Sequence, residues 1–477
     1  FLQRALHFNP AFVDGFHNLG VVYQHMHKYD EAQLAFRMAV KMKPDFAKSH
    51  AGLGEIHATL GNFPEAIAAF TESLRLRDDP AVRLNLGLAY LHSSNYAPAI
   101  EHFTAAHASA PDAYTRYLAL FNRGAALDAK GRYNESAADY QAAVAFAPKD
   151  VDAMFNMGLS LMAAERKGEA LKAFRDVIQI DPNNMDAYFN AATLHSDLKQ
   201  YQSALDLLEP VQKRIPNHKR VNYMMGHLYH RLGRLAESHD MFNRVIKSGH
   251  EDVPSQLKAD AYAGLASVFD DSGNLSGAID LYREAQHLDK SVYLHYNLSK
   301  ILRRVRKYDE SIKEALAAVD LDPRNYTYIL ALAEVYNDAE NLGKAFDIYK
   351  QASELADSEP YPRFMMAYTA SRQRLWSTAL TEYNRLLSAN ISPEVRGAVH
   401  KGIGNIYHEQ GEFEKSLAAY KDASADLPRD STLFYNISRT YFQMGQYQES
   451  LESFTPIETG VYASPLADSF QFGKARS

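Results

Sequence analysis

Asparagine and phenylalanine stand side by side at a regular spacing along part of this chain. Asn122, Asn156 and Asn190 follow one another at intervals of 34 residues, and each is preceded by a phenylalanine. An asparagine side chain carries both a hydrogen-bond donor and an acceptor, which are the two groups that an extended peptide backbone needs as partners. A neighbouring ring adds apolar contact, on the order of 1–3 kcal/mol when well buried. The pattern predicts a surface that binds extended peptides whatever their side chains.

The same residue types recur at the fifth and sixth positions of a repeating unit of 34 residues. The asparagines of the predicted groove are Asn18, Asn85, Asn122, Asn156, Asn190, Asn297 and Asn436. The aromatic residues of the predicted groove are Phe121, Phe155, Phe189, Tyr223 and Tyr296. Because Asn85, Asn122, Asn156 and Asn190 lie in consecutive units, we expect the strongest binding there.

A structural interpretation of the same pattern stays open beside this one. In it, each asparagine bonds a neighbouring helix, and the aromatic rings pack between adjacent helices. Acidic residues such as Asp152 and Asp186 often occupy the second position of the unit. They argue against capture of an acidic C-terminal tail, which would need lysine and arginine there.

Other chemistry finds little support in the sequence. The chain contains no cysteine, which excludes thiol nucleophiles and cysteine-ligated metals. His227 and His230 lie three residues apart, but no acidic ligand accompanies them at regular metal spacing. Nucleophile elbows, phosphate loops and dinucleotide fingerprints do not occur. We therefore predict no enzyme, with no catalytic residue, no metal and no cofactor.

The repeating unit itself explains how these residues would be positioned. Pro148, Pro182 and Pro216 mark its period of 34 residues. A small residue at position 8 and alanine at position 20 let two helices approach closely, and aromatic rings at positions 11 and 24 fill the space around them. Proline near position 32 ends the second helix. In residues 13–46 these are Gly20, Tyr23, Ala32, Phe36 and Pro44.

This signature is similar to that of the tetratricopeptide repeat family, and the resemblance covers nearly the whole chain. It implies an all-α, right-handed superhelical solenoid of about thirteen antiparallel helix pairs. The first helix of each pair (A helix) would line a concave groove, with positions 2, 5, 6, 9, 12 and 13 pointing into it. The asparagine series also resembles the tetratricopeptide arm of O-linked N-acetylglucosamine transferases, whose glycosyltransferase domain is absent here.

The repeats divide the chain into predicted segments. We expect the second helix of a truncated repeat at 1–12, repeats 1–7 at 13–252, an insertion at 253–258, repeats 8–13 at 259–458 and an irregular tail at 459–477. Shorter insertions are expected at 114–116 and 394–396. The insertion at 253–258 should lengthen the turn between two repeats.

Composition sets limits on partners and compartment. The net charge of −7 argues against a general nucleic-acid binder, and no stretch resembles a membrane span. The chain opens at Phe1 without methionine, so we expect a piece of a longer protein. A cytoplasmic location is expected, with a periplasmic one left open.

The sequence thus predicts a non-enzymatic scaffold that binds proteins or extended peptides within a hetero-oligomeric complex. Two alternatives stand. One is a structural subunit of a large permanent assembly for transport, secretion or the cytoskeleton. The other is the substrate-binding arm of an enzyme whose catalytic domain lies outside this sequence.

Overall fold

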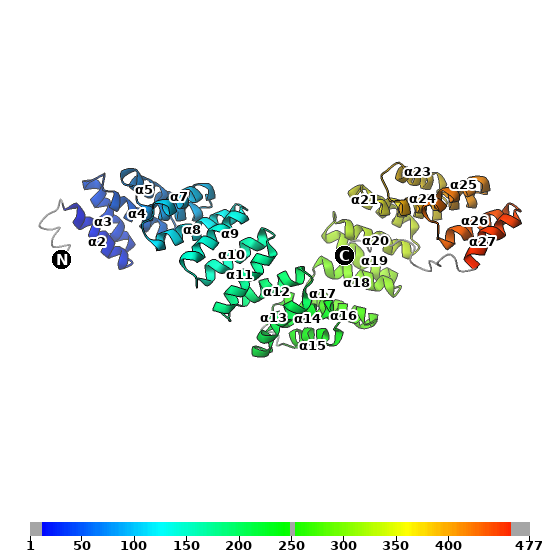
Figure 1. Cartoon of the computed structure of the whole chain (residues 1–477), viewed down its shortest axis with the longest axis horizontal. Coiled ribbons are helices and arrows are strands. Elements are labelled where there is room, and N and C mark those ends of the chain that lie inside the picture. Colours follow the sequence, from blue (N-terminus) through cyan, green and yellow to red (C-terminus); the bar gives the residue numbers. More distant parts are fainter. Residues whose placement is uncertain (1–11, 249–252, 459–477) are drawn as a thin grey trace. The chain divides into compact units, whose positions relative to one another are not determined.

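The structure, a computed structural model, describes residues 12–248 and 253–458, and within them every regular element is an α-helix (Figure 1). The helices alternate between A helices and second helices (B helices) of successive repeats. The A helices are α2 Val13–His25, α4 Ala47–Thr59, α6 Pro80–His92, α8 Ala113–Ala129, α10 Val151–Ala163, α12 Met185–Asp197, α14 Lys219–Arg231, α16 Ser255–Asp271, α18 Val292–Arg304, α20 Tyr326–Asp338, α22 Pro360–Arg372, α24 Pro393–Glu409 and α26 Ser431–Gln443. The B helices are α3 Tyr29–Met42, α5 Phe63–Leu76, α7 Tyr96–Ser109, α9 Tyr133–Phe146, α11 Lys167–Ile180, α13 Tyr201–Arg214, α15 Leu235–Ile246, α17 Leu275–Leu288, α19 Tyr308–Leu321, α21 Leu342–Leu355, α23 Trp376–Leu387, α25 Phe413–Asp426 and α27 Tyr447–Glu458. The predicted all-α solenoid of helix pairs is confirmed.

The chain forms two compact units, Phe1–Pro216 and Asn217–Ser477. The first contains repeats 1–6 and the second contains repeats 7–13. Within each unit, a B helix packs against its own A helix and against the A helix of the next repeat. The predicted helix at 1–12 and tail at 459–477 fall outside the described residues, apart from Phe12, which precedes α2.

All three short insertions lengthen A helices, and the one at 253–258 also lengthens the connection between two repeats as expected, since α15 ends at Ile246 and α16 begins only at Ser255. Helices α8, α16 and α24 each have 17 residues, whereas the other A helices have 13. Ser255–Lys258, expected as part of a longer turn, forms the first turn of α16. An α-helix completes a turn in 3.6 residues, so about four extra residues extend the helix without rotating its buried face. Repeats 7 and 8 accordingly share one apolar cluster that includes Phe242, Val253 and Leu265.

The close approach of the two helices in a repeat depends on a small residue at position 8, and glycine there leaves room for a large ring. A β-carbon on Gly158 would lie 2.7 Å from the ring of Phe174, at position 24 of the same repeat. Gly226 has the same relation to Phe242, at 2.8 Å. Both rings are fully buried, so a larger residue at position 8 would have to displace them.

Serine replaces the expected alanine at position 20 in some repeats and adds a hydrogen bond to the same contact. The hydroxyl of Ser136 donates to the carbonyl of Gly124 at 2.9 Å, and Ser238 donates to the carbonyl of Gly226 at 2.7 Å. These buried bonds tie position 20 of the B helix to position 8 of the A helix.

Each A helix ends in a left-handed residue at position 15. Six of the thirteen residues are glycines with φ between 71° and 82°, and seven are other residues with φ between 55° and 61°. The following residue returns a hydrogen bond to position 11, as Arg132 N–H does to the Leu127 carbonyl at 2.9 Å. This is the Schellman motif, in which glycine is the preferred residue.

Stability should therefore respond in opposite directions to matched changes at position 15. Lys199 has φ 57° and Gly131 has φ 72°, and a β-carbon on Gly131 would meet no neighbouring atom. We expect Gly131→Ala to destabilise the protein by about 1 kcal/mol, because a left-handed conformation costs L-residues on that order. Lys199→Gly should raise the melting temperature. Thermal melting of the two variants checks this, and a lower melting temperature for both would contradict it.

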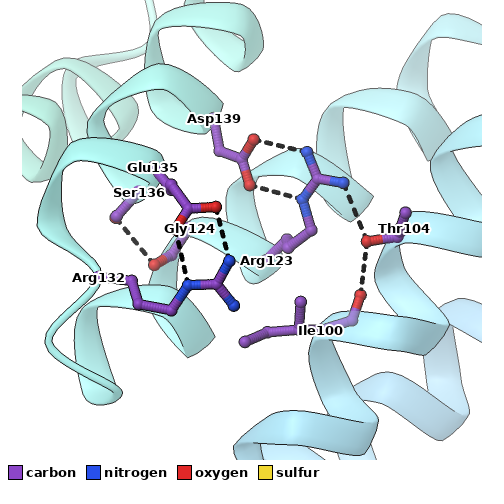
Figure 2. Close-up of polar contacts among 8 residues, drawn as sticks. All are labelled: Ile100, Thr104, Arg123, Gly124, Arg132, Glu135, Ser136 and Asp139. Carbon is purple, nitrogen blue, oxygen red and sulfur yellow. Dashed lines mark hydrogen bonds and ion pairs between the residues drawn. The ribbon is translucent and has the colours of Figure 1, made fainter.

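An ion pair takes the place of an apolar contact in repeat 4 (Figure 2). Arg123 stands at position 7, where leucine is usual, and its guanidinium donates two hydrogen bonds of 2.6 Å to the carboxylate of Asp139 on α9. It also donates to the hydroxyl of Thr104 on α7, in the preceding repeat, at 3.0 Å. The side chains of Arg123 and Asp139 are only 20% and 10% exposed. The pair thus links three helices of repeats 3 and 4.

Breaking this pair from one side should be costly. Arg123→Leu leaves the Asp139 carboxylate nearly buried without a counter-charge, which should destabilise by about 3 kcal/mol. Replacing both residues with leucine should recover most of that loss. The exposed pair of Arg132 and Glu135, also in Figure 2, supplies the control, since Arg132→Leu should barely move the melting temperature. If Arg123→Leu and the double leucine variant had the same melting temperature, the loss of stability would not come from the unpaired Asp139 carboxylate.

Candidate binding face

The groove-facing positions predicted from the repeat form one surface on the A helices. We call positions 2, 5, 6, 9, 12 and 13 of the A helices the A face. In the second unit a hollow of about 460 Å³ opens on this face. Fourteen of its sixteen lining residues occupy these positions in α18, α20, α22, α24 and α26, and the other two are the position-24 rings of Tyr349 and Tyr383. The A-face positions of α18 to α26 therefore line a hollow in the second unit.

In the first unit, the asparagines of repeats 3–6 lie half-buried on the A face. Within residues 12–248 and 253–458, the amides of Asn85, Asn156 and Asn190 make no hydrogen bond. Asn122 differs, because its amide nitrogen donates to the Leu118 carbonyl of its own helix at 2.7 Å. Three of the four asparagines of repeats 3–6 thus keep both their hydrogen-bond donor and their acceptor available.

The neighbouring aromatic residues belong partly to the core. Phe121 lies edge-on to the ring of Tyr140 at 5.5 Å, and Phe155 has the same arrangement with the Phe174 ring at 5.6 Å. Both are half-buried against the B helix of their own repeat, not between A helices as the structural interpretation supposed. Phe189 is only 4% exposed, so it offers little surface to a ligand.

The remaining predicted residues do not join this group. Asn436 donates to the side-chain oxygen of Asn405 at 2.9 Å, linking α26 to α24 as the structural interpretation expects. Tyr296 lies 5.3 Å from the Tyr328 ring, and its neighbour Asn297 makes no hydrogen bond among the described residues. Tyr223 packs edge-on to the ring of His227 at 4.6 Å. The single asparagine of repeat 1, Asn18, is exposed.

Among the residues predicted for the groove, Asn436 alone lines the hollow in the second unit. Its walls include Tyr361 and Tyr368, at positions 2 and 9 of repeat 11, and its floor reaches the Tyr349 ring. Position 6 is Met365 in repeat 11 and Gly402 in repeat 12, so the asparagine pattern reaches the hollow only through Asn436 of repeat 13. Two tyrosines on one A helix at A-face positions were the signal that could have found it.

Ion pairs surround this hollow. Arg303 contacts the carboxylate of Glu334 and lies 3.1 Å from that of Asp338. Lys401 lies 2.6 Å from the carboxylate of Asp430. Both cations are therefore already neutralised by residues of neighbouring repeats.

The tyrosine hydroxyls of the hollow remain protonated at neutral pH. Burial raises the pKa of Tyr349, and it likewise raises the pKa of Tyr361, where the Glu334 carboxylate adds to the effect. Each hydroxyl can accordingly donate a hydrogen bond as well as accept one.

The histidines serve packing and hydrogen bonding. His195 is buried, and its Nδ1 lies 2.8 Å from the side-chain oxygen of Gln200. His230 pairs with Asp271 at 2.8 Å, while His227 packs on aromatic rings. No group of three metal-ligating side chains occurs among the described residues. No helix in this part of the chain has the length and apolar character to cross a bilayer.

Models of the tetratricopeptide repeat match nearly all of the described chain. The matched segments are 17–80, 60–114, 84–151, 161–217, 223–291, 296–360, 364–431 and 431–455. The chain belongs to the tetratricopeptide repeat family, as the sequence signature predicted. Members of this family are protein-interaction modules, and the chain is an interaction scaffold in that general sense.

Individual relatives are distant. The human protein named Protein O-mannosyl-transferase TMTC1 is 24% identical over 220 residues, which cover 45% of this chain and 24% of that protein. The Drosophila melanogaster BBSome complex member BBS4 homolog is 23% identical over 156 residues, covering 32% of this chain and 31% of that protein. The chain thus spans less than a third of either relative. The crystal structure of yeast Tom70 aligns with 87% of this chain and 95% of its own, at 14% identity and a TM-score of 0.39.

Proposed function

We propose that the chain is a non-enzymatic scaffold that holds an extended segment of a partner protein along the A face of repeats 3–6. The observation that carries this is the set of unpartnered amides of Asn85, Asn156 and Asn190. Half-buried amides without partners favour a ligand that supplies both donors and acceptors. An extended peptide backbone does so at every residue.

The spacing of the asparagines from one A helix to the next suits an extended peptide. Packed helices lie about 8–10 Å apart, and an extended chain advances roughly 3.3 Å per residue. One asparagine per A helix would then meet a peptide about every third residue. The half-buried ring of Phe155 stands next to Asn156 in the sequence, and the half-buried ring of Phe121 stands next to Asn122.

Membership of a multiprotein complex is part of this proposal. Support comes from a relative whose name describes it as a BBSome complex member. The relative named as an O-mannosyl-transferase matches over 24% of its own length, so we propose binding without catalysis for this chain. A cytoplasmic location stays a prediction from the sequence.

Replacing the three unpartnered amides should weaken peptide binding without unfolding the protein. Peptides of about fifteen residues would be selected from a random phage-displayed pool against the full chain. Asn85→Ala, Asn156→Ala and Asn190→Ala together should weaken their binding by ten- to a hundredfold, since each lost pair of hydrogen bonds is worth about 1 kcal/mol. The melting temperature should hold, because these amides bond nothing in the fold.

A matched triple variant provides the control. Asn134, Gln141 and Gln179 are exposed residues with amide side chains on the B helices α9 and α11. Replacing all three with alanine should leave binding intact. If both triple variants bind the selected peptides equally well, the asparagines of the A face are not the site.

A further inference from the structure

The hollow of repeats 9–13 contains polar groups that the fold leaves unsatisfied. Tyr349 is 0% exposed, and its hydroxyl has no hydrogen-bond partner among the described residues. The side-chain oxygen of Asn337 is buried without a partner as well. Both residues line the hollow. An unsatisfied buried polar group costs about 1–3 kcal/mol. The Asn337 oxygen can only accept, so it favours a ligand that brings a hydrogen-bond donor, and the Tyr349 hydroxyl is able to accept from such a donor as well.

The charged residues around the hollow indicate which charge that ligand carries. Arg303 and Lys401 are the cations, and their partners are the three carboxylates of Glu334, Asp338 and Asp430. The two cations and two carboxylates that line the hollow balance, and Asp430, which is not part of the lining, gives the whole cluster one negative charge in excess. Asp338 is the most accessible of the carboxylates, with its side chain 40% exposed, against 27% for Glu334 and 15% for Asp430. A cation suits this site, and an anion would have to compete with carboxylates already bound to both cations.

Aromatic rings add a second feature that favours a cation. Tyr368 stands at the wall of the hollow and is 40% exposed, and its ring already attracts one cation, the Arg372 guanidinium at 5.9 Å from the ring centre. The ring of Tyr361 lies beside Glu334, whose carboxylate it approaches at 3.4 Å through its hydroxyl. Faces of tyrosine rings attract ammonium and guanidinium groups. The unsatisfied hydrogen-bond acceptor, the accessible carboxylate and the tyrosine rings thus all favour a cationic ligand.

We propose that this hollow binds a basic side chain, lysine or arginine, presented by an extended segment of a partner protein. The charged head would donate hydrogen bonds toward Asn337 and Tyr349 and lie near Asp338, with its aliphatic stem against the tyrosine rings. The site lies in the second unit and uses none of the asparagines of repeats 3–6. A binding test of this site can therefore fail or succeed independently of the test of the peptide site in the first unit.

Four peptides that differ in one residue test the chemistry. Each is a fluorescein-labelled Gly-Ser nonapeptide with arginine, lysine, glutamine or glutamate at its centre, titrated against the full chain by fluorescence anisotropy. The arginine or lysine peptide should bind at least tenfold more tightly than the glutamine and glutamate peptides, and added salt should weaken it. Equal binding of all four, or tighter binding of the glutamate peptide, would overturn the proposal.

Two variants of the chain locate the binding. Asp338→Asn should weaken the basic peptide several-fold, whereas Asp347→Asn, an exposed acid on the B helix of the same repeat, should leave it unchanged. Tyr349→Phe removes only the unpartnered hydroxyl, so it should weaken the basic peptide while the melting temperature holds or rises. If Tyr349→Phe binds as the wild type does, the hydroxyl plays no part in recognition and the proposed site is wrong.

Discussion

The distance between the two helices of each repeat is set by a small residue at position 8, which is glycine in seven of the thirteen repeats and alanine or serine in the others. Gly158 and Gly226 leave room for the rings of Phe174 and Phe242, which would otherwise be 2.7 and 2.8 Å from a β-carbon. Because this contact recurs with the repeat, each A helix has the same rotation about its axis. The same six positions therefore reach the A face in one repeat after another, and any residue type repeated at one of them becomes a line of side chains on that surface.

Much of this follows from the sequence because the deciding contacts lie within one repeat. Small residues and rings at fixed positions predict the helix pair, its boundaries and its outward-facing positions, as in residues 151–184 with Gly158 and Phe174. The left-handed residue at position 15 could have been predicted from Gly131 and Gly233, but not from Lys199 or Arg306, which adopt the same conformation without glycine. The insertion at 253–258 was expected to lengthen the turn, but the extension of α16 was not expected, because helix continuation and a longer turn both take up added residues and only packing distinguishes them.

The hollow could not be predicted from the repeat, because it arises between repeats. Its depth depends on Gly402 and Ala398 standing opposite large tyrosines of repeat 11. Its charge depends on pairs such as Arg303 with Glu334, which are 31 residues apart and meet only when α18 packs beside α20. The ion pair of Arg123 and Asp139 shows a similar limit, since a charged residue at a core position predicts a partner without identifying it. The two units thus present different chemistry on the A face: position 6 is asparagine throughout repeats 3–6, whereas charged and phenolic groups surround the hollow of repeats 9–13.

The central claim is that partners lie along the A face, and photo-crosslinking from single positions tests it most directly. Thr193 occupies position 9 of α12 and is exposed, while Gln179 is exposed on the neighbouring B helix α11. Benzoylphenylalanine would replace each in turn, and the peptides selected by the full chain would be irradiated with both forms. The account predicts cross-links from position 193 and none from position 179. Cross-links from position 179 alone would place the partner on the B helices and contradict it.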